Sequence, residues 1–196
     1  DETELYQRDR TGAYERVVVA LLDGGDAFHC TCSRQDLHLD NGAHAAACPR
    51  SRTAPAGESA IRLHARGTSY RFSDIFLGGG ELPGPAGTDD FVIRRRDGLY
   101  AYQLAVVIDD AFQGITHVVR GRDLLESTPH QIFLRARLGL APVRYGHIPL
   151  LLNAQGQKLS KQNHAPPLDD ARAPHNLLLC LEALGQLPPP PAVCND

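Results

Sequence analysis

The chain has 196 residues, of which 42% are hydrophobic, which is enough for a buried core in one domain with an insertion or in two small domains. A formal net charge of -3 argues against nucleic-acid binding through overall basic charge, although Arg94 to Arg96, and Arg120 with Arg122, form local basic patches. Five cysteines are an odd number, untypical of a disulfide framework, and indicate a reducing, cytoplasmic setting. No apolar run approaches a membrane span and no signal-peptide pattern is present, so we expect no membrane partner.

Hydrophobic periodicity predicts the elements of the first half of the chain. Apolar residues at helical spacing predict an amphipathic helix over residues 11–22 that ends at Gly24 and Gly25. Neither helical nor strand spacing is clear over residues 30–52, so something other than a hydrophobic core must hold that segment. Alternating apolar residues predict strands between residues 59 and 72, whereas the glycine- and proline-rich residues 78–87 predict a loop.

The second half has an α/β pattern. We expect Thr128 to cap its second helix, with Pro129 at the first position and Gly139 at the C-terminal end. Alternating strands and helices predict parallel pairing with right-handed crossovers, and a ligand crevice where the strands end. The predicted elements are strands at 91–93, 115–119 and 145–152, helices at 102–112, 129–138 and 176–184, and a polyproline tail at 188–191.

A lysine loop follows the predicted strand 145–152 and a glycine turn; it runs Lys158-Leu159-Ser160-Lys161-Gln162. Two lysines three residues apart most often belong to a solvated surface loop. Their position after a buried strand favours phosphate binding instead, because a lysine is a mobile point charge that can follow a phosphate. Preorganised positive charge also stabilises a phosphoryl group during its transfer.

A possible metal site lies in the irregular segment. Cys30-x-Cys32 is followed by His44-x-x-x-Cys48, and four such ligands suit tetrahedral zinc. Closed coordination would make the metal structural. The alternative is three unrelated thiols, since C-x-C is less diagnostic than C-x-x-C. His29 and His38 lie near the cysteines and compete with His44 as the fourth ligand. We assign Cys180 to the core and Cys194 to the tail.

Several collinear strings resemble the glutamyl-queuosine tRNA(Asp) synthetases. These are small class I aminoacyl-tRNA synthetases, related to glutamyl-tRNA synthetase, that lack an anticodon-binding domain. The string at 158–166 resembles the second class I signature in the form that this family carries, and the likeness runs from about Tyr6 to Gly185. The matching strings are KLSKQNHAP at 158–166, DFVI at 90–93, DGLYAY at 97–102, VVIDD at 106–110 and VVRG at 118–121.

The resemblance implies an α/β fold, namely the back half of the Rossmann-type catalytic fold of class I synthetases with an inserted zinc-bearing subdomain. Residues 1–29 would end the first half of the nucleotide-binding fold, and residues 30–97 would form the inserted subdomain. Residues 98–185 would form the second half with the lysine loop, and residues 186–196 a proline-rich tail. We expect a monomer.

The resemblance also implies a two-step reaction. ATP, with Mg²⁺, activates glutamate to glutamyl-adenylate, and the glutamyl group then passes to queuosine in the anticodon of tRNA(Asp). Lys161 would be catalytic, stabilising the charge that moves onto pyrophosphate, with Lys158 and Ser160 also binding ATP. Tyr102 and Arg120 match the family's glutamate-binding pair, and a guanidinium suits a carboxylate. Taken alone, each would more often be a core aromatic or a surface ion-pair residue.

For the metal site the resemblance implies Zn²⁺ held by Cys30, Cys32, His44 and Cys48. The family often has tyrosine where this chain has His44, which is a departure, but histidine is the better zinc ligand. We assign Asp109 and Asp110 a structural role, capping and hydrogen bonding at a helix end.

Two features leave the activity open. Nothing here matches the first class I signature, a histidine-containing loop, and the chain begins with Asp1 and contains no methionine. We therefore expect an internal fragment that cannot form adenylate alone. One alternative is a fragment of a discriminating glutamyl-tRNA synthetase acting on tRNA(Glu), which the string at 162–166 argues against. The other is a non-catalytic zinc-bearing RNA-binding module, which the presence of Tyr102, Arg120 and Lys161 together argues against.

Overall fold

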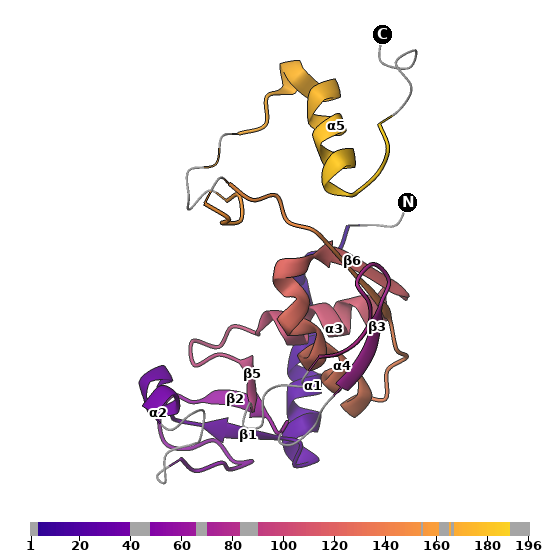
Figure 1. Cartoon of the computed structure of the whole chain (residues 1–196). Coiled ribbons are helices and arrows are strands. Elements are labelled where there is room, and N and C mark those ends of the chain that lie inside the picture. The colour runs from indigo at the N-terminus through magenta and orange to yellow at the C-terminus, as the bar shows by residue number, and fades with distance from the viewer. Residues whose placement is uncertain are drawn as a thin grey trace.

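Two separate β-sheets organise the chain, as the computed structural model shows (Figure 1). The structure describes residues 4–39, 48–65, 70–82, 90–153, 155–160, 165 and 167–188. The strands are β1 Ala27–Cys30, β2 Ala60–Leu63, β3 Tyr70–Asp74, β4 Gly78–Leu82, β5 Phe91–Arg94, β6 His117–Gly121 and β7 Arg144–Ile148. The helices are η1 Gln7–Arg10, α1 Thr11–Asp23, α2 Arg34–Leu39, α3 Tyr102–Phe112, η2 Arg122–Ser127, α4 Thr128–Arg137, η4 Asp170–Arg172 and α5 Ala173–Ala183.

Helix α1 confirms the prediction from helical spacing. It buries Tyr14, Val18 and Leu21, and Gly25 follows it with a φ of 76°. Its polar contact with α3 is made by the carboxylate of Asp109, which accepts hydrogen bonds from the Tyr14 hydroxyl at 2.6 Å and from Nε of Arg10 at 3.1 Å. Asp109 therefore has the structural role expected of it, although it joins two helices rather than capping one.

The first sheet is antiparallel and has the strand order β1-β2-β5. The expected parallel pairing of the strand at 91–93 with the later strands is therefore wrong. Ile61 and Leu63 of β2 and Phe91 and Ile93 of β5 are all buried in the main hydrophobic cluster, which also receives α1, α3 and α4. β5 joins β2 because this pairing places the apolar face of each strand on that cluster.

The second sheet has the order β4-β3-β7-β6 and contains the predicted parallel unit. β6 and β7 pair in parallel, with α4 in the crossover between them, and β3 pairs in parallel with β7 at Asp74 and Tyr145. β4 pairs antiparallel with β3, so the loop expected at residues 78–87 is wrong for residues 78–82. Three consecutive glycines have no side chains that could reveal a strand period, so the pattern missed β4.

Helix α4 has Pro129 in its first turn, one position later than expected, because the helix begins at Thr128. It ends at Arg137, and Gly139, which we expected at the C-terminal end, follows the C-cap Leu138 with a φ of 64°. Thr128 is not its cap: the N-cap is Ser127, and no side-chain capping bond forms. The Thr128 side chain is fully buried and is used in a tertiary contact described below. The short helix α2 lies within residues 30–52, where neither period was recognised.

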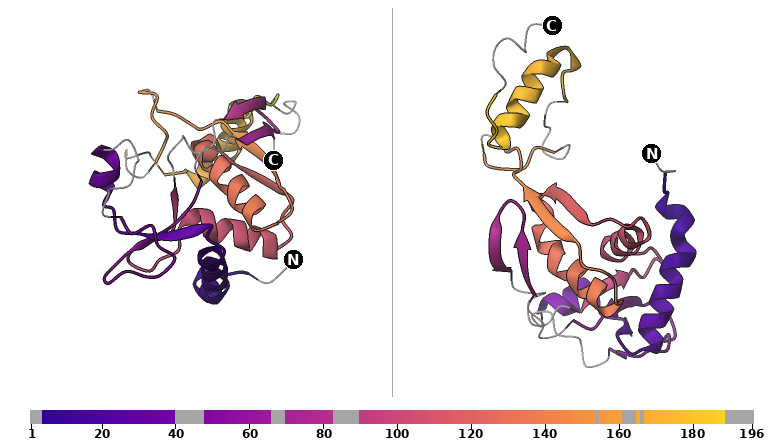
Figure 2. Two further views of the ribbon diagram at one scale, coloured as in Figure 1. Left: turned by 90° about the horizontal axis from the view of Figure 1, so that it is seen from below. Right: turned by 90° about the vertical axis from the view of Figure 1, so that its right-hand side faces the viewer.

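Helix α5 stands apart from the body that contains the two sheets (Figures 1 and 2). As a result Cys180 is exposed, so its assignment to the core is wrong. The local sequence shows that this helix is apolar but does not show what it packs against. Among the described residues, no helix has the length and apolar character needed to cross a bilayer.

Candidate functional site

The candidate site is built around Arg120, near the end of β6. Strand pairing places Arg120 directly opposite His147 of β7, and both lie near the carboxyl ends of these parallel strands. The sequence predicted this crevice, and the lysine loop follows the second of the two strands. Gly121 directly precedes η2, and a Cβ there would require the Asp123 and Leu150 side chains, 2.6 and 3.1 Å away, to shift.

Each nitrogen of the Arg120 guanidinium has a protein acceptor. Nε donates to Nε2 of His147 at 3.1 Å, Nη1 to the side-chain oxygen of Gln131 at 2.8 Å, and Nη2 to the Thr128 hydroxyl at 2.8 Å. All three acceptors are neutral, and within the described ranges Arg120 forms no ion pair with a carboxylate. A guanidinium has five N–H donors, so two remain for a ligand. Arg120 thus presents an oriented guanidinium that forms no direct ion pair among the described residues, although its charge opposes the burial that raises the pKa of Asp110 and helps to lower the pKa of Asp123.

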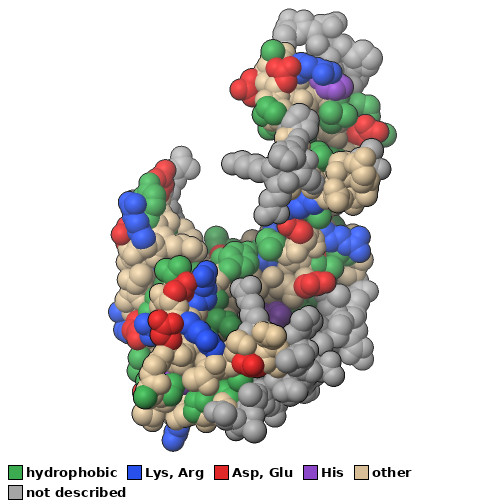
Figure 3. All heavy atoms as spheres, turned by 90° about the vertical axis from the view of Figure 1, so that its left-hand side faces the viewer, with side chains coloured by type: hydrophobic (Ala, Val, Ile, Leu, Met, Phe, Trp, Pro, Cys, Tyr) green, Lys and Arg blue, Asp and Glu red, His purple; other side chains and the backbone are tan. Residues whose placement is uncertain are grey.

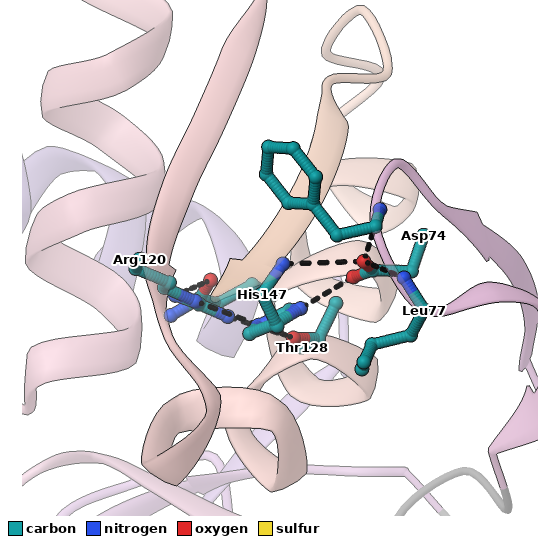
Figure 4. A network of polar contacts seen from close by, with 7 residues as sticks. Asp74, Leu77, Arg120, Thr128 and His147 are labelled. Atoms are coloured by element: carbon teal, nitrogen blue, oxygen red, sulfur yellow. Dashed lines mark hydrogen bonds and ion pairs between the residues drawn. The ribbon is translucent and has the colours of Figure 1, made fainter. Parts of the chain in front are cut away.

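His147 connects Arg120 to a buried carboxylate. Its side chain is fully buried, and its Nδ1 lies 2.6 Å from Oδ2 of Asp74 (Figure 4). Because Arg120 can only donate, Nε2 of His147 must accept, which leaves the proton on Nδ1, where it bonds to Asp74. The other oxygen of Asp74 accepts from the backbone N–H groups of Phe76, Leu77 and His147.

Burial alone would raise the pKa of Asp74, but hydrogen bonds from the His147 side chain and from the backbone outweigh this effect and lower the pKa to about 2. Asp74 is therefore a carboxylate throughout the physiological pH range. The sequence predicted Arg120 but neither Asp74 nor His147, because these residues meet only after β3, β6 and β7 have paired.

Tyr102 is the first residue of α3, and its side chain is 47% exposed. Its neighbour Gln103 accepts a hydrogen bond at 2.7 Å from Gln131, which also binds Arg120. Burial, the largest effect, together with Tyr102 and Asp110, raises the pKa of Tyr145 to about 12 against the opposing effect of Arg120. Arg120 itself lies over the Tyr145 ring, 5.3 Å from its centroid, whereas no hydrogen bond joins Tyr102 to Arg120 in the described part of the chain.

The lysine loop begins as a tight hairpin. Oδ1 of Asn153 accepts from the backbone N–H groups of Gln155 and Gln157, and Leu152 then pairs with Lys158. Nζ of Lys158 forms an ion pair with Asp123 of η2, whose pKa is lowered chiefly by this hydrogen bond. The loop is thus joined to the segment that directly follows Arg120. Lys161 lies outside the described residues, as do residues 162–164 and 166, so its predicted role stays a prediction.

Three of the four predicted metal ligands come together. The sulfur atoms of Cys30, Cys32 and Cys48 all lie within 4.8 Å of one another, and no disulfide joins the described cysteines. Zinc–sulfur bonds of about 2.3 Å in a tetrahedron place sulfurs ~3.8 Å apart, so this cluster fits a zinc ion after small shifts. His44 and Cys194 lie outside the described residues, and so does the side chain of His38.

The cluster favours a metal-binding thiolate. Burial would raise the pKa of the Cys48 thiol, but backbone hydrogen bonds at Arg50 and Thr31, and the other two thiols, outweigh this and lower it. Of the competing histidines, His29 has its Nδ1 2.8 Å from the Ser59 hydroxyl. Phe28 and Leu37 pack beside the cysteines.

The basic patch at residues 94–96 is largely neutralised. Arg94 pairs with Glu15 and Arg95 with Asp97, while Arg96 donates to the backbone oxygen of Thr31. A cavity of about 420 Å³ beside this patch is lined by arginines and by carboxylates alike. Acidic and basic side chains are also interspersed on the face shown in Figure 3. The described residues form no broad basic surface on that face.

Comparison with known proteins identifies the family of the chain. Residues 49–171 match the family described as tRNA synthetases class I (E and Q), catalytic domain. The chain therefore belongs to the class I aminoacyl-tRNA synthetases of this family.

The chain is 48% identical over 189 residues to the Glutamyl-Q tRNA(Asp) synthetase of Pseudomonas fluorescens, covering 96% of this chain and 63% of that protein. It is also 48% identical over 185 residues to the protein of the same name from Pseudomonas aeruginosa, covering 93% and 62%. The chain thus spans less than two thirds of the length of these curated relatives.

Two solved structures share the fold. One is a glutamate tRNA ligase from Elizabethkingia meningosepticum in complex with its amino acid, with a TM-score of 0.66 and 23% identity over 87% of this chain and 41% of that one. The other is the glutamate-tRNA synthetase of Elizabethkingia anophelis, with a TM-score of 0.63 and 24% identity over 80% and 37%.

Proposed function

We propose that this chain is part of the catalytic domain of a glutamyl-queuosine tRNA(Asp) synthetase. The reaction activates glutamate with ATP and transfers the glutamyl group to queuosine in the anticodon of tRNA(Asp). The 48% identity to curated proteins of that name, over nearly the whole chain, supports this substrate pair. The observation that carries the proposal in the structure is Arg120, a guanidinium that is held by three neutral acceptors and that forms no direct ion pair with any carboxylate of the described residues.

Arg120 and Tyr102 bind glutamate in this proposal. The two free N–H groups of Arg120 donate to a ligand carboxylate, and the exposed hydroxyl of Tyr102 orients the same ligand. A carboxylate is the ligand class that completes Arg120, because its two oxygens match the two remaining N–H groups and no carboxylate of the described residues is bonded to them.

ATP occupies the crevice beside the lysine loop in this proposal. Lys158 and Ser160 contact its phosphates, and Lys161 stabilises the charge that moves onto pyrophosphate. Lys158 exchanges its exposed ion pair with Asp123 for phosphate contacts at little cost, because exposed pairs contribute about 1 kcal/mol or less. Mg²⁺ accompanies ATP as part of the substrate.

A zinc ion bound by Cys30, Cys32, Cys48 and His44 fixes the inserted segment of residues 30–97. Three converging sulfurs support this assignment, and His44 supplies the fourth ligand. Zinc here is structural, because four protein ligands leave no open coordination position. Metal analysis of His44→Ala tests the fourth ligand, and an unchanged zinc content would remove His44 from the set.

The decisive assay uses a chimera, in which this chain is joined to the part of the Pseudomonas fluorescens relative that it does not cover. We expect glutamate transfer to tRNA(Asp) that contains queuosine and none to tRNA(Asp) that lacks it. Arg120→Lys should raise the KM for glutamate by at least about tenfold, since a lysine cannot reproduce the bidentate geometry. The matched control Arg95→Lys changes an exposed arginine paired with Asp97 and should leave KM unchanged.

The same assay separates the alternatives. Charging of tRNA(Glu) instead of tRNA(Asp) would identify a glutamyl-tRNA synthetase. Binding of RNA without glutamate-dependent pyrophosphate exchange would identify a non-catalytic module. Pyrophosphate exchange by the 196-residue chain alone would contradict our expectation that these residues cannot form adenylate without the first signature.

A further inference from the structure

We propose that Asp74 and His147 form a positioning pair that holds the Arg120 guanidinium in the orientation needed to receive the substrate carboxylate. The inference rests on the proposed function for the identity of the ligand, but the geometry of the pair is independent of it. The pair adds two residues, from β3 and β7, to the one that sequence matching identified.

The first step concerns which groups can orient Arg120. Thr128 and Gln131 bind the two terminal nitrogens, and both come from α4. Among the described residues, only His147 binds Nε, the nitrogen that fixes the plane of the guanidinium relative to its stem. His147 is itself immobilised, since its side chain is fully buried and lies in a shell of aromatic rings that includes Tyr145.

The second step concerns the tautomer. Nε2 of His147 can accept from Arg120 only if the single proton of the neutral ring is on Nδ1. Oδ2 of Asp74 lies 2.6 Å from Nδ1 and accepts that proton's hydrogen bond, so Asp74 selects the tautomer that Arg120 requires. Thr128 fits the same arrangement: its hydroxyl lies 3.1 Å from Nε2 and can donate to it while accepting from Arg120.

The third step concerns Asp74→Asn, a nearly isosteric substitution that tests whether Asp74 selects the tautomer of His147. The Oδ1 atom of Asp74 accepts three backbone N–H bonds, at 3.0, 3.0 and 3.2 Å. In an Asp74→Asn variant the amide oxygen must take this position, because the amide NH₂ cannot accept. The NH₂ group then faces Nδ1 of His147 as a donor. The histidine proton moves to Nε2, where it opposes the Nε–H of Arg120.

Asp74→Asn should therefore release Arg120 without emptying any space. Nitrogen NMR of the imidazole should show Nδ1–H in the wild-type chain and Nε2–H in the variant. The Arg120 Nε–H signal, slow to exchange in the wild type, should become fast. Glutamate binding, followed by NMR titration, should weaken about tenfold to a hundredfold, which is the usual effect of losing a hydrogen bond to a charged group.

Two further variants separate positioning from folding. His147→Gln retains a neutral acceptor for Arg120 and should keep most of the glutamate affinity, whereas His147→Leu should lose it. Asp97→Asn makes the same chemical change on an exposed aspartate and should leave glutamate binding and both NMR signals unchanged.

The outcomes decide between the two proposals. An unchanged Arg120 Nε–H signal in Asp74→Asn, or unaltered glutamate affinity despite the change of tautomer, would overturn the positioning pair. If the wild-type chimera described above binds no glutamate while the tautomer and the Arg120 signal respond as expected, the pair is supported and the glutamate assignment fails.

Discussion

The hydroxyl of Tyr14 should contribute strongly to stability because it binds a buried carboxylate between two helices. Tyr14 is 2% exposed and Asp109 is 6% exposed, and their oxygens are 2.6 Å apart. Tyr14→Phe removes this donor and leaves Asp109 with Arg10 at 3.1 Å and a long contact from Gln7 at 3.4 Å. Losing a hydrogen bond to a charged group costs about 1.5–3 kcal/mol, so the free energy of unfolding should fall by about 2 kcal/mol.

The chain offers a matched control. The hydroxyl of Tyr100 donates to the carboxylate of Glu15, whose side chain is 46% exposed. Water can replace that donor, so Tyr100→Phe should cost only about 0.5 kcal/mol. The two rings also pack edge to face against each other, with centroids 5.3 Å apart, and both variants keep that contact.

Urea unfolding followed by circular dichroism at pH 7 measures both losses. The slope of the free energy of unfolding against urea concentration should be the same in the wild type and the two variants, so that a shift in the unfolding midpoint reports a change in stability alone. Equal losses for the two variants, or a loss below about 1 kcal/mol for Tyr14→Phe, would refute the argument that burial of the acceptor sets the cost.

Three further predictions concern the second sheet and the cysteine cluster. Gly146→Ala should destabilise the chain by about 1–3 kcal/mol, because the added Cβ would lie 2.8 Å from the Phe76 ring, whereas Gly12→Ala, with its nearest atom at 3.7 Å, should not. The pKa of Asp74 falls from 3.8 to about 2 on folding, so its stabilisation is present above pH 4 and disappears as the pH falls through 2. Between pH 5 and pH 2, the free energy of unfolding of the wild type, measured by urea titration, should fall by about 2 kcal/mol more than that of Asp74→Asn. An equal fall in the two proteins would contradict this prediction. A strong chelator should lower the thermal midpoint of the wild type and of Cys180→Ser but not that of Cys30→Ser, with zinc measured by elemental analysis.

The sequence predicted best the elements in which one face is apolar over many residues. The helix at residues 102–112 was predicted with the boundaries that α3 has, because its apolar face packs continuously into the core. β4 escaped prediction because its glycines carry no pattern, and the pairing of β5 was misjudged because a short strand does not indicate its partner. Cys180 was misplaced for a related reason, since an apolar helix does not indicate whether it has a neighbour.

The candidate sites also contain residues that local sequence predicts and residues that only the folded structure brings together. The cysteine cluster depends on local spacing, so three of its ligands could be predicted and are found together. Arg120 could be proposed from its motif, but its direct partners come from β7 and α4, up to 27 residues away along the chain, and Asp74 of β3 acts on it only through His147. Sequence distance hides such partners, because only the pairing register brings their side chains into contact.

Arg120 and Lys158, which we propose to bind different ligands, differ in how the fold holds their positive charges. Lys158 already has an anion, Asp123, in an exposed pair that water and salt weaken. Arg120 has only neutral acceptors and is oriented by a buried histidine whose tautomer a carboxylate selects. The negative charge of Asp74 is separated from the guanidinium by the imidazole ring. Asp74 thus helps to fix the direction of Arg120 without forming a direct ion pair with it, which leaves two N–H groups of Arg120 for the carboxylate that we propose it binds.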